Sequence, residues 1–446
     1  MNRREMRRRR RRRNQIIDYI LAALILAGIV FGCIFAVRSV SGEGREGGDP
    51  GAVQEETGGT DRQGQMEQGG ETEDSASPET EAGQQQEPSA GQEETSSAET
   101  LEERVSSYVG SMTLEEKVAG LFIITPEQLT GVGTAVQAGE STKEALERYP
   151  VGGLVYFAQN IQSASQLKEM LANTVSYSKY PLFLGVDEEG GRVARVADGL
   201  GLENVGPMAD IGASQDASEA YAAGAAIGAY LKEYGFNLDF APVADVLTNP
   251  DNTVIGDRSF GNDPAVVSQM VASEVQGLEE NGVSACLKHF PGHGDTAGDS
   301  HDGQVETDRT LEQMQTVEFL PFSAGIEAGA DMVMVGHISA PGLTDGDKVP
   351  ASMNEKIITE ILRGQLGYNG IVITDAMNMS AISQYYTADE AAIRALKAGA
   401  DMILMPEDFV TAYEGVIAAV QNGTIDEDRI NDSLTRIYRV KCGQSM

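Results

Sequence analysis

Short apolar segments recur along residues 101–446, and longer amphipathic stretches separate them. Several of the short segments are rich in β-branched residues and almost continuously hydrophobic, which is typical of strands buried on both faces of a parallel sheet. The stretches between them, such as 217–234 and 264–281, are long enough for amphipathic helices. The pattern predicts eight strands, at 120–124, 153–157, 181–186, 237–243, 284–290, 331–337, 370–374 and 401–405.

Regular alternation of strand and helix predicts an α/β fold with a parallel sheet. Eight such units within 101–446 favour a (β/α)8 TIM-type barrel, and a doubly wound open sheet is the alternative. In barrel enzymes the active site lies at the carboxyl ends of the strands. We therefore expect the side chains that carry chemistry to follow the apolar runs directly.

Charge divides the chain into three parts. The 446 residues carry a formal net charge of −35. An acidic chain of this kind lacks the basic face of a nucleic-acid-binding protein, so we expect no nucleic-acid partner. The net charge is +8 over 1–38, −14 over 41–100 and −29 over 101–446. The two parts before the predicted barrel therefore carry net charges of opposite sign.

The first part has the features of a membrane anchor. An apolar run over 16–37 follows a block of arginines, and about 20 apolar residues suffice to cross a bilayer. Because positive residues stay inside, we expect a basic cytoplasmic segment at 1–15, a transmembrane signal-anchor helix at 16–37 and an extracellular catalytic domain. The protein would then be a single-pass protein of the cell membrane. A cleaved signal peptide is the alternative.

Residues 38–100 consist mostly of Glu, Gln, Gly, Ser and Thr, with almost no large apolar residue. Such a segment has nothing to bury against the entropy cost of folding, so we predict a disordered acidic linker. The domain that follows it spans 101–446.

Polar side chains follow several of the predicted strands. Asp187 comes after the third strand and Asp375 after the seventh. Lys288 and His289 lie at the end of the fifth strand, and His337 ends the sixth. This is the rim where a barrel would have its active site.

The clustered histidines suggest a metal site as one interpretation. His289, His293 and His301 lie within thirteen residues of one another, with Asp295 and Asp299 among them, and all are good ligand types. A His-x-x-x-His pair binds zinc when a helix places both residues on one face, but the prolines and glycines in this stretch prevent a helix. Polar residues that only satisfy the loop backbone are a second interpretation.

Glycoside hydrolysis is the third interpretation. A retaining glycosidase needs a carboxylate nucleophile and an acid/base group about 5–5.5 Å apart across the scissile bond. Asp375, at the end of a buried strand, is a candidate nucleophile. A histidine can serve as the acid/base because its pKa lies near neutral pH, and Asp299 can orient His301 from two positions away.

The stretch 288–296, with Asp299 and His301 after it, resembles the motif of glycoside hydrolase family 3 enzymes of the β-N-acetylhexosaminidase type. The resemblance extends over roughly 105–440, where further motifs follow in the expected order at 112–118, 187–195 and 256–261. By this similarity Asp375 is the nucleophile, His301 the acid/base and Asp299 its partner. The residues that would hold the N-acetylglucosamine unit are Asp187, Arg195, Arg258, Lys288 and His289.

The resemblance implies a retaining exo-β-N-acetylglucosaminidase that releases terminal N-acetylglucosamine from peptidoglycan fragments or related glycans. A glycosyl-aspartate intermediate is implied, and neither a cofactor nor a metal ion. The amino-sugar glycan is the expected partner, besides the membrane. Two alternatives stay open: a β-N-acetylglucosaminide phosphorylase, which would use phosphate in place of water, and a catalytically inactive, tethered glycan-binding domain.

Overall fold

The computed structural model describes residues 100–298 and 303–444. Eight parallel strands form one sheet, in the order β11-β9-β7-β6-β3-β2-β1-β12. A parallel bridge between Ile373 and Met402 joins β11 to β12 and closes the sheet into a barrel. The barrel strands are β1 (Phe122–Ile124), β2 (Gly153–Val155), β3 (Phe183–Val186), β6 (Leu238–Asp239), β7 (Ser284–Phe290), β9 (Met332–Val335), β11 (Ile371–Thr374) and β12 (Ile403–Leu404).

Two smaller sheets accompany the barrel. An antiparallel hairpin follows β3, and a short parallel pair lies among the later loops. The hairpin strands are β4 (Glu188–Gly190) and β5 (Val193–Ala194), and the parallel pair is β8 (Val305–Glu306) with β10 (Ile338–Ser339).

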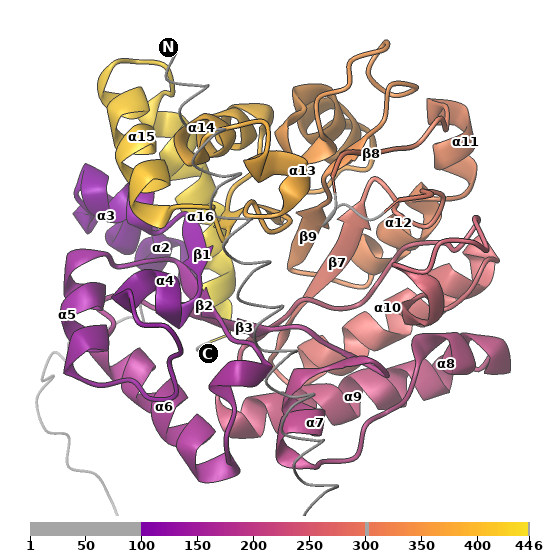
Figure 1. Ribbon diagram of the computed structural model, residues 1–446, viewed down its shortest axis with the longest axis horizontal. Coiled ribbons are helices and arrows are strands. Elements are labelled where there is room, and N and C mark those ends of the chain that lie inside the picture. Colours follow the sequence, from indigo (N-terminus) through magenta and orange to yellow (C-terminus); the bar gives the residue numbers. More distant parts are fainter. Residues whose placement is uncertain (1–99, 299–302, 445–446) are drawn as a thin grey trace, which may run out of the picture. The chain divides into compact units, whose positions relative to one another are not determined.

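Helices surround the barrel strands on the outside, as Figure 1 shows for α5, α6, α9, α10 and α12 around the central strands. The α-helices are α2 (Leu101–Ser111), α3 (Leu114–Ala119), α4 (Pro126–Thr130), α5 (Glu140–Arg148), α6 (Ala164–Tyr177), α7 (Arg195–Leu200), α8 (Met208–Ser214), α9 (Ala217–Tyr234), α10 (Pro264–Glu280), α11 (Leu311–Thr316), α12 (Phe319–Glu327), α13 (Ser380–Ser383), α14 (Ala388–Ala398), α15 (Phe409–Gln421) and α16 (Glu427–Gly443). The 3₁₀ and π segments are η1 (Ala158–Asn160), η2 (Gly256–Arg258), η3 (Ala351–Met353) and η4 (Lys356–Gln365).

Several helix starts follow from the local sequence. Thr100, Thr113 and Ser163 precede α2, α3 and α6, and each side chain accepts a hydrogen bond from the backbone N–H three residues on. The side chain at that third position in turn accepts a bond from the N–H of the cap residue, which completes a capping box. The pairing satisfies backbone groups that the first turn of a helix leaves without partners.

The structure confirms the eight predicted strands and the closed barrel, so the open-sheet alternative is wrong. Strand β7 and helix α9 have the predicted bounds. Strand β6 ends earlier than predicted, at Asp239, because Pro242 has no N–H to donate to the ladder. A bridge between Val243 and Lys288 then resumes the pairing with β7.

The prediction of a membrane-spanning helix before the barrel needs correction. No helix in the described ranges, 100–298 and 303–444, is long and apolar enough to cross a bilayer. The segments predicted at 1–15 and 16–37, and all but the last residue of the linker predicted at 38–100, lie outside those ranges. The fold class that the structure supports is therefore the α/β barrel, with no transmembrane helix assigned to it.

Helix α10 carries a carboxyl group in the protein interior. Glu274 is fully buried, and neither of its carboxyl oxygens has a hydrogen-bond partner among the described residues. Burial, together with the negative charge of Glu189, raises the pKa of Glu274 to about 8. The ordinary value is 4.5, so near neutral pH the folded protein holds a proton on this group that the unfolded chain releases.

Replacing Glu274 by methionine is expected to stabilise the barrel, and increasingly so as the pH rises. Because the folded pKa is the higher one, the stability of the wild-type protein falls between pH 4.5 and about 8, by up to about 1.4 kcal/mol for each pH unit. Urea unfolding should therefore give Glu274→Met an advantage of a few kcal/mol at pH 8 and a smaller one at pH 5. Glu169→Met, at an exposed site of α6, is the control. An equal advantage at both pH values would contradict the interpretation.

Candidate active site

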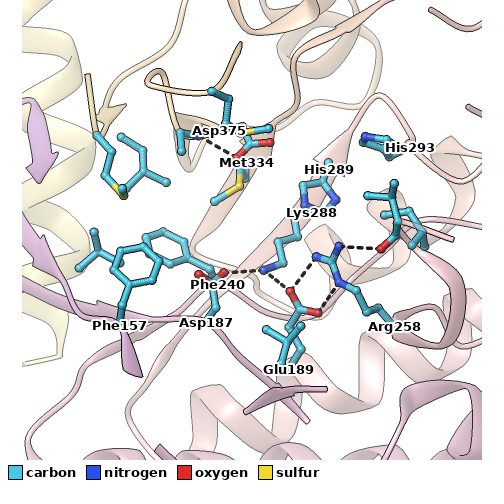
Figure 2. A pocket seen from close by; sticks show the side chains of 18 of the residues that line it. Phe157, Asp187, Glu189, Phe240, Arg258, Lys288, His289, His293, Met334 and Asp375 are labelled. Carbon is cyan, nitrogen blue, oxygen red and sulfur yellow. Dashed lines mark hydrogen bonds and ion pairs between the residues drawn. The ribbon is translucent and has the colours of Figure 1, made fainter. Parts of the chain in front are cut away.

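A cavity of about 390 Å³ lies at the carboxyl ends of the barrel strands, within the size range of small-molecule sites. Charged side chains form one part of its lining and apolar side chains another (Figure 2). The charged and polar residues that line it are Asp187, Glu189, Arg195, Arg258, Lys288, His289, His293, Asp375 and Asn378. The apolar ones include Phe157, Phe240, Met334, Met379, Leu404 and Met405.

The barrel strands deliver the charged side chains to this one place. Asp187 is the first residue after β3, and Asp375 is the first residue after β11. Lys288 and His289 lie within the last three residues of β7. Because all the barrel strands are parallel, their carboxyl ends meet at the same mouth.

Lys288 and His289 are neighbours in sequence, yet both line the cavity. Successive side chains of a regular strand point to opposite faces, so a regular β7 would present only one of them. The pairing of β7 with β9 shifts register between Leu287 and Phe290, where three steps along β7 match two along β9. A bulge of this kind bends the strand and re-aims its side chains, and it brings both residues to the barrel mouth.

Two cations share one carboxylate in the cavity wall. Glu189 accepts hydrogen bonds from Arg258 at 2.7 and 2.8 Å and pairs with the ammonium group of Lys288 at 2.5 Å. Asp187 pairs with the same ammonium group at 2.8 Å. The side chains of Lys288 and Glu189 are each only 2% exposed, so solvent screens these charges little. Figure 2 shows that Asp187, Lys288, Glu189 and Arg258 form one connected row of charges, the Glu189 row.

Pairing keeps these buried groups charged. Burial works against the ionised form of Glu189, but the charges of Lys288 and Arg258 outweigh it and lower the pKa of this carboxyl. Burial likewise opposes the ammonium of Lys288, and Asp187 and Glu189 raise its pKa above the ordinary value. Glu189 also raises the pKa of Arg258 against the effect of burial. Glu189, Lys288 and Arg258 therefore supply fixed charges near neutral pH.

His289 is oriented from behind by a buried carboxylate. Its Nδ1 lies 2.8 Å from Oδ2 of Asp245, which is fully buried. Burial works against the charge of Asp245, but His289 lowers the pKa of this carboxyl. With Nδ1 engaged in this way, Nε2 is the ring nitrogen of His289 that can meet a ligand.

His293 holds the loop that follows β7. Its backbone N–H donates to Asp245 at 2.6 Å, and its carbonyl accepts from Asn252 at 2.8 Å. Its Nδ1 lies 2.7 Å from the hydroxyl of Thr296. Burial, with the charge of His289, lowers the pKa of His293 and favours the neutral ring. These contacts assign His293 to the shape of the loop.

Asp375 lies beside Met334, away from the Glu189 row (Figure 2). Its backbone N–H donates to the carbonyl of Val335 at 2.9 Å, and its Oδ1 accepts from the N–H of Ala376 at 2.7 Å. The buried His337 binds the Ala376 carbonyl through Nε2 at 3.0 Å. The turn that carries Asp375 is thus held by its neighbours, as a reacting group at a fixed position requires.

Arg195 brings a hydrogen-bond donor to the cavity. It is the first residue of α7 and lines the cavity wall. Its Nε is buried and has no hydrogen-bond partner among residues 100–298 and 303–444. An unpaired buried donor costs free energy, so a ligand oxygen at this position would be bound favourably.

The predicted substrate-binding residues and the predicted nucleophile all line this one cavity: Asp187, Arg195, Arg258, Lys288, His289 and Asp375. Their individual roles stay predictions. The predicted acid/base, His301, and its partner Asp299 lie outside the described residues. Within the described part of the chain, no three potential metal ligands converge on one point.

The sequence prediction assigned no role to Glu189, which contacts two of the predicted sugar-binding cations. A signal was present, since Glu189 lies two positions after Asp187 in the motif at 187–195. The hairpin of β4 and β5 begins directly after Asp187, and spacing alone does not predict where its side chains point. The apolar part of the lining was missed as well.

Comparison with known proteins agrees with this geometry. The glycosyl hydrolase family 3 N-terminal domain matches residues 113–440. β-Hexosaminidase A of Pseudoalteromonas piscicida is 36% identical over 67% of this chain and 54% of its own length. β-Hexosaminidase LpqI of Mycobacterium tuberculosis is 34% identical over 70% of this chain and 81% of its own. The solved family 3 β-N-acetylglucosaminidase from Paenibacillus sp. superimposes with a TM-score of 0.69, at 35% identity, over 75% of this chain and 63% of that one.

The barrel and its charged cavity are those of a glycoside hydrolase, and the chain belongs to glycosyl hydrolase family 3. The predicted resemblance to the β-N-acetylhexosaminidase type is confirmed by relatives named β-hexosaminidase and by the solved family 3 β-N-acetylglucosaminidase. The chain spans only about half the length of the Pseudoalteromonas relative.

Proposed function

We propose that this protein is a retaining exo-β-N-acetylglucosaminidase. The observation that carries the proposal is the convergence of Asp375 with sugar-binding side chains in one cavity of about 390 Å³. A cavity of this size lies within the range of sites that hold small molecules such as one sugar unit. The names of the relatives support the same activity.

The charged side chains divide the work of holding the sugar. Asp187 can accept hydrogen bonds from sugar hydroxyls, because an ionised carboxylate is only an acceptor. Arg195, Arg258 and Lys288 can donate to hydroxyl and acetamido oxygens, and His289, whose Nδ1–H faces Asp245, can accept a hydrogen bond from a sugar hydroxyl through Nε2. The Glu189 row fixes two of these donors before the sugar arrives, which lowers the ordering cost of binding.

The reaction proceeds in two displacements. Asp375 attacks C1 of the sugar while the bond from C1 to the leaving oxygen breaks, and His301 gives that oxygen a proton. The glycosyl-Asp375 ester forms on the opposite face. His301 then takes a proton from water, the water oxygen bonds to C1, and the Asp375 carboxylate leaves. Two inversions at C1 retain the β configuration. The part of His301, with Asp299 as its partner, rests on the family resemblance.

We propose peptidoglycan fragments or related amino-sugar glycans as the natural substrates. The proposal is supported by the donors and acceptors in the cavity, which suit a polar amino sugar. The extracellular location expected from residues 1–37 stays a prediction, because those residues lie outside the described ones.

Turnover of nitrophenyl β-N-acetylglucosaminide tests the proposed function. We expect release of nitrophenol, free N-acetylglucosamine as the sugar product, and no dependence on added phosphate. The nitrophenyl β-glucoside, which lacks the acetamido group, is the control substrate and should react far more slowly. Formation of a sugar 1-phosphate would make the protein a phosphorylase. No turnover by a folded protein would leave only a glycan-binding role.

A further inference from the structure

The hairpin of β4 and β5 ends in a tight turn beside the active site. Gly190 and Gly191 adopt φ values of 83° and 54°, which favour glycine. A Cβ on Gly190 would lie 2.7 Å from the side chain of Val205, and one on Gly191 would lie 2.9 Å from Cα of Pro207. The turn is therefore packed closely and fixes the starting point of the next side chain, Arg192.

Arg192 binds the backbone of a loop that is distant in sequence. Its Nη2 donates to three successive carbonyls, those of Thr253, Val254 and Ile255, at 3.1, 2.8 and 3.0 Å. Its Nε pairs with the carboxylate of Asp257 at 2.9 Å. One guanidinium group thus contacts four residues of a five-residue stretch.

The loop bound by Arg192 forms part of the cavity wall. Val254, Ile255 and Arg258 line the cavity, whereas Arg192 does not. The loop contains one short 3₁₀ segment, η2, and the carbonyls of Val254 and Ile255 accept bonds from Nη1 and from the backbone N–H of Arg258. Arg192 adds a bond to each of these two carbonyls and one to the carbonyl of Thr253, and the bond to Ile255 is the partly buried one of the three.

The same hairpin also holds the side chain of Arg258. Glu189, three residues before Arg192, accepts two hydrogen bonds from the Arg258 guanidinium at 2.7 and 2.8 Å. The hairpin therefore acts on Arg258 at two points: Glu189 binds its guanidinium in the cavity wall, and Arg192 binds the backbone of the residues before it.

We infer that Arg192 is a positioning residue for substrate binding, which acts on the sugar through the loop 253–258 and Arg258. The inference rests on the proposed function, because it takes Arg258 as a ligand of the sugar. Arg192 itself is 44% exposed and its ion pair with Asp257 lies at the surface, so that pair contributes little. The carbonyl bonds carry the effect, and all three are made by Nη2 at the far end of the side chain.

The test measures kcat and KM for nitrophenyl β-N-acetylglucosaminide in the full chain. Arg192→Ala and Arg192→Lys should each raise KM about 10-fold with a smaller change in kcat, the pattern expected when binding is lost. Lysine keeps the charge beside Asp257, but its side chain is one bond shorter than the path to Nη2, so its ammonium should not reach the carbonyls or restore KM. The matched control, Asp257→Asn, removes the surface charge pair and should keep KM within about 2-fold of wild type.

A double-mutant cycle with Arg258 separates positioning from general stabilisation. Once Arg258→Ala has removed the sugar contact, adding Arg192→Ala should raise KM little further. The inference is overturned if the KM of the double variant rises by the product of the two single-variant increases. It is also overturned if Arg192→Ala keeps the wild-type KM, or if Arg192→Lys restores it fully. Turnover by the unaltered protein reports separately on the proposed function.

Hydrogen exchange of the backbone amides over 253–258 gives a readout that needs no turnover. Exchange in this loop should become faster in Arg192→Ala and stay unchanged in Asp257→Asn. Unchanged exchange in Arg192→Ala would overturn the inference even if the protein proved inactive on this substrate.

Discussion

An Asp375→Ala variant should hydrolyse nitrophenyl β-N-acetylglucosaminide on the order of 10⁴-fold more slowly than the wild-type protein, or slower still. The variant lacks the carboxylate that attacks C1, and no other group of the turn can replace it. The measurement is kcat from released nitrophenol, with thermal unfolding to show that the barrel is intact. Asp345→Ala, which removes a carboxylate whose side chain is 91% exposed, should keep wild-type activity.

Azide supplies a positive test on the same variant. In Asp375→Ala the small anion can occupy the space of the carboxylate and attack C1, so that nitrophenolate leaves and the α-glycosyl azide forms. We expect azide to accelerate Asp375→Ala and to leave the wild-type protein unaffected. An Asp375→Ala variant with wild-type kcat would contradict the assignment, and a β-glycosyl azide product would place the attacking group elsewhere.

A Glu189→Gln variant should lose both stability and substrate binding. The change leaves Lys288 paired with Asp187 alone and deprives Arg258 of a bidentate partner. Breaking a buried ion pair from one side costs about 3–5 kcal/mol, and misplaced binding groups can lower kcat/KM by about 100-fold. Chemical unfolding and steady-state kinetics at pH 7 measure the two effects. The ordinary pKa of 4.5 is lowered in the fold, so the stabilisation by Glu189 is present above pH 4.5 and declines as the pH falls below it.

Glu188→Gln is the matched control for this prediction. Glu188 is the neighbouring carboxylate on the same hairpin, but it accepts bonds from the N–H groups of Val196 and Ala197 and from the hydroxyl of Tyr230. It does not line the cavity. We expect Glu188→Gln to lose some stability and to keep KM near the wild-type value. If Glu189→Gln kept wild-type stability and kcat/KM, the row of paired charges would have no functional part.

Much of the fold could be predicted because hydrophobic periodicity follows directly from burial. Strand β7 is buried along its whole length and begins with small and apolar residues, and helix α9 has polar residues on its outer side. Parallel strands then bring their carboxyl ends together, which predicted that Asp187 and Asp375 would share one site. The closure of the barrel through Ile373 and Met402 depends on curvature, which the pattern indicates only through the number of strands.

The finer parts of the site depend on contacts between residues far apart in sequence. The roles of Glu189 and Arg192 follow from a glycine turn and from a loop about 60 residues further on, and neither leaves a periodic pattern. The bulge that presents both Lys288 and His289 comes from a register shift against β9, which single-strand spacing does not encode. These features depend on which distant chain segments lie next to each other in the fold, and the sequence pattern does not predict that.

The central claim is that Asp375 forms a covalent bond to the sugar, and trapping that ester tests it most directly. The probe is a fluorinated N-acetylglucosaminyl fluoride, whose good leaving group speeds formation of the ester and whose ring fluorine slows its hydrolysis. Mass spectrometry of the treated, digested protein should find one added fluorinated sugar on the peptide that contains Asp375, and none on that peptide in Asp375→Ala. A protein that hydrolyses the nitrophenyl substrate yet carries the label on another residue would contradict the account.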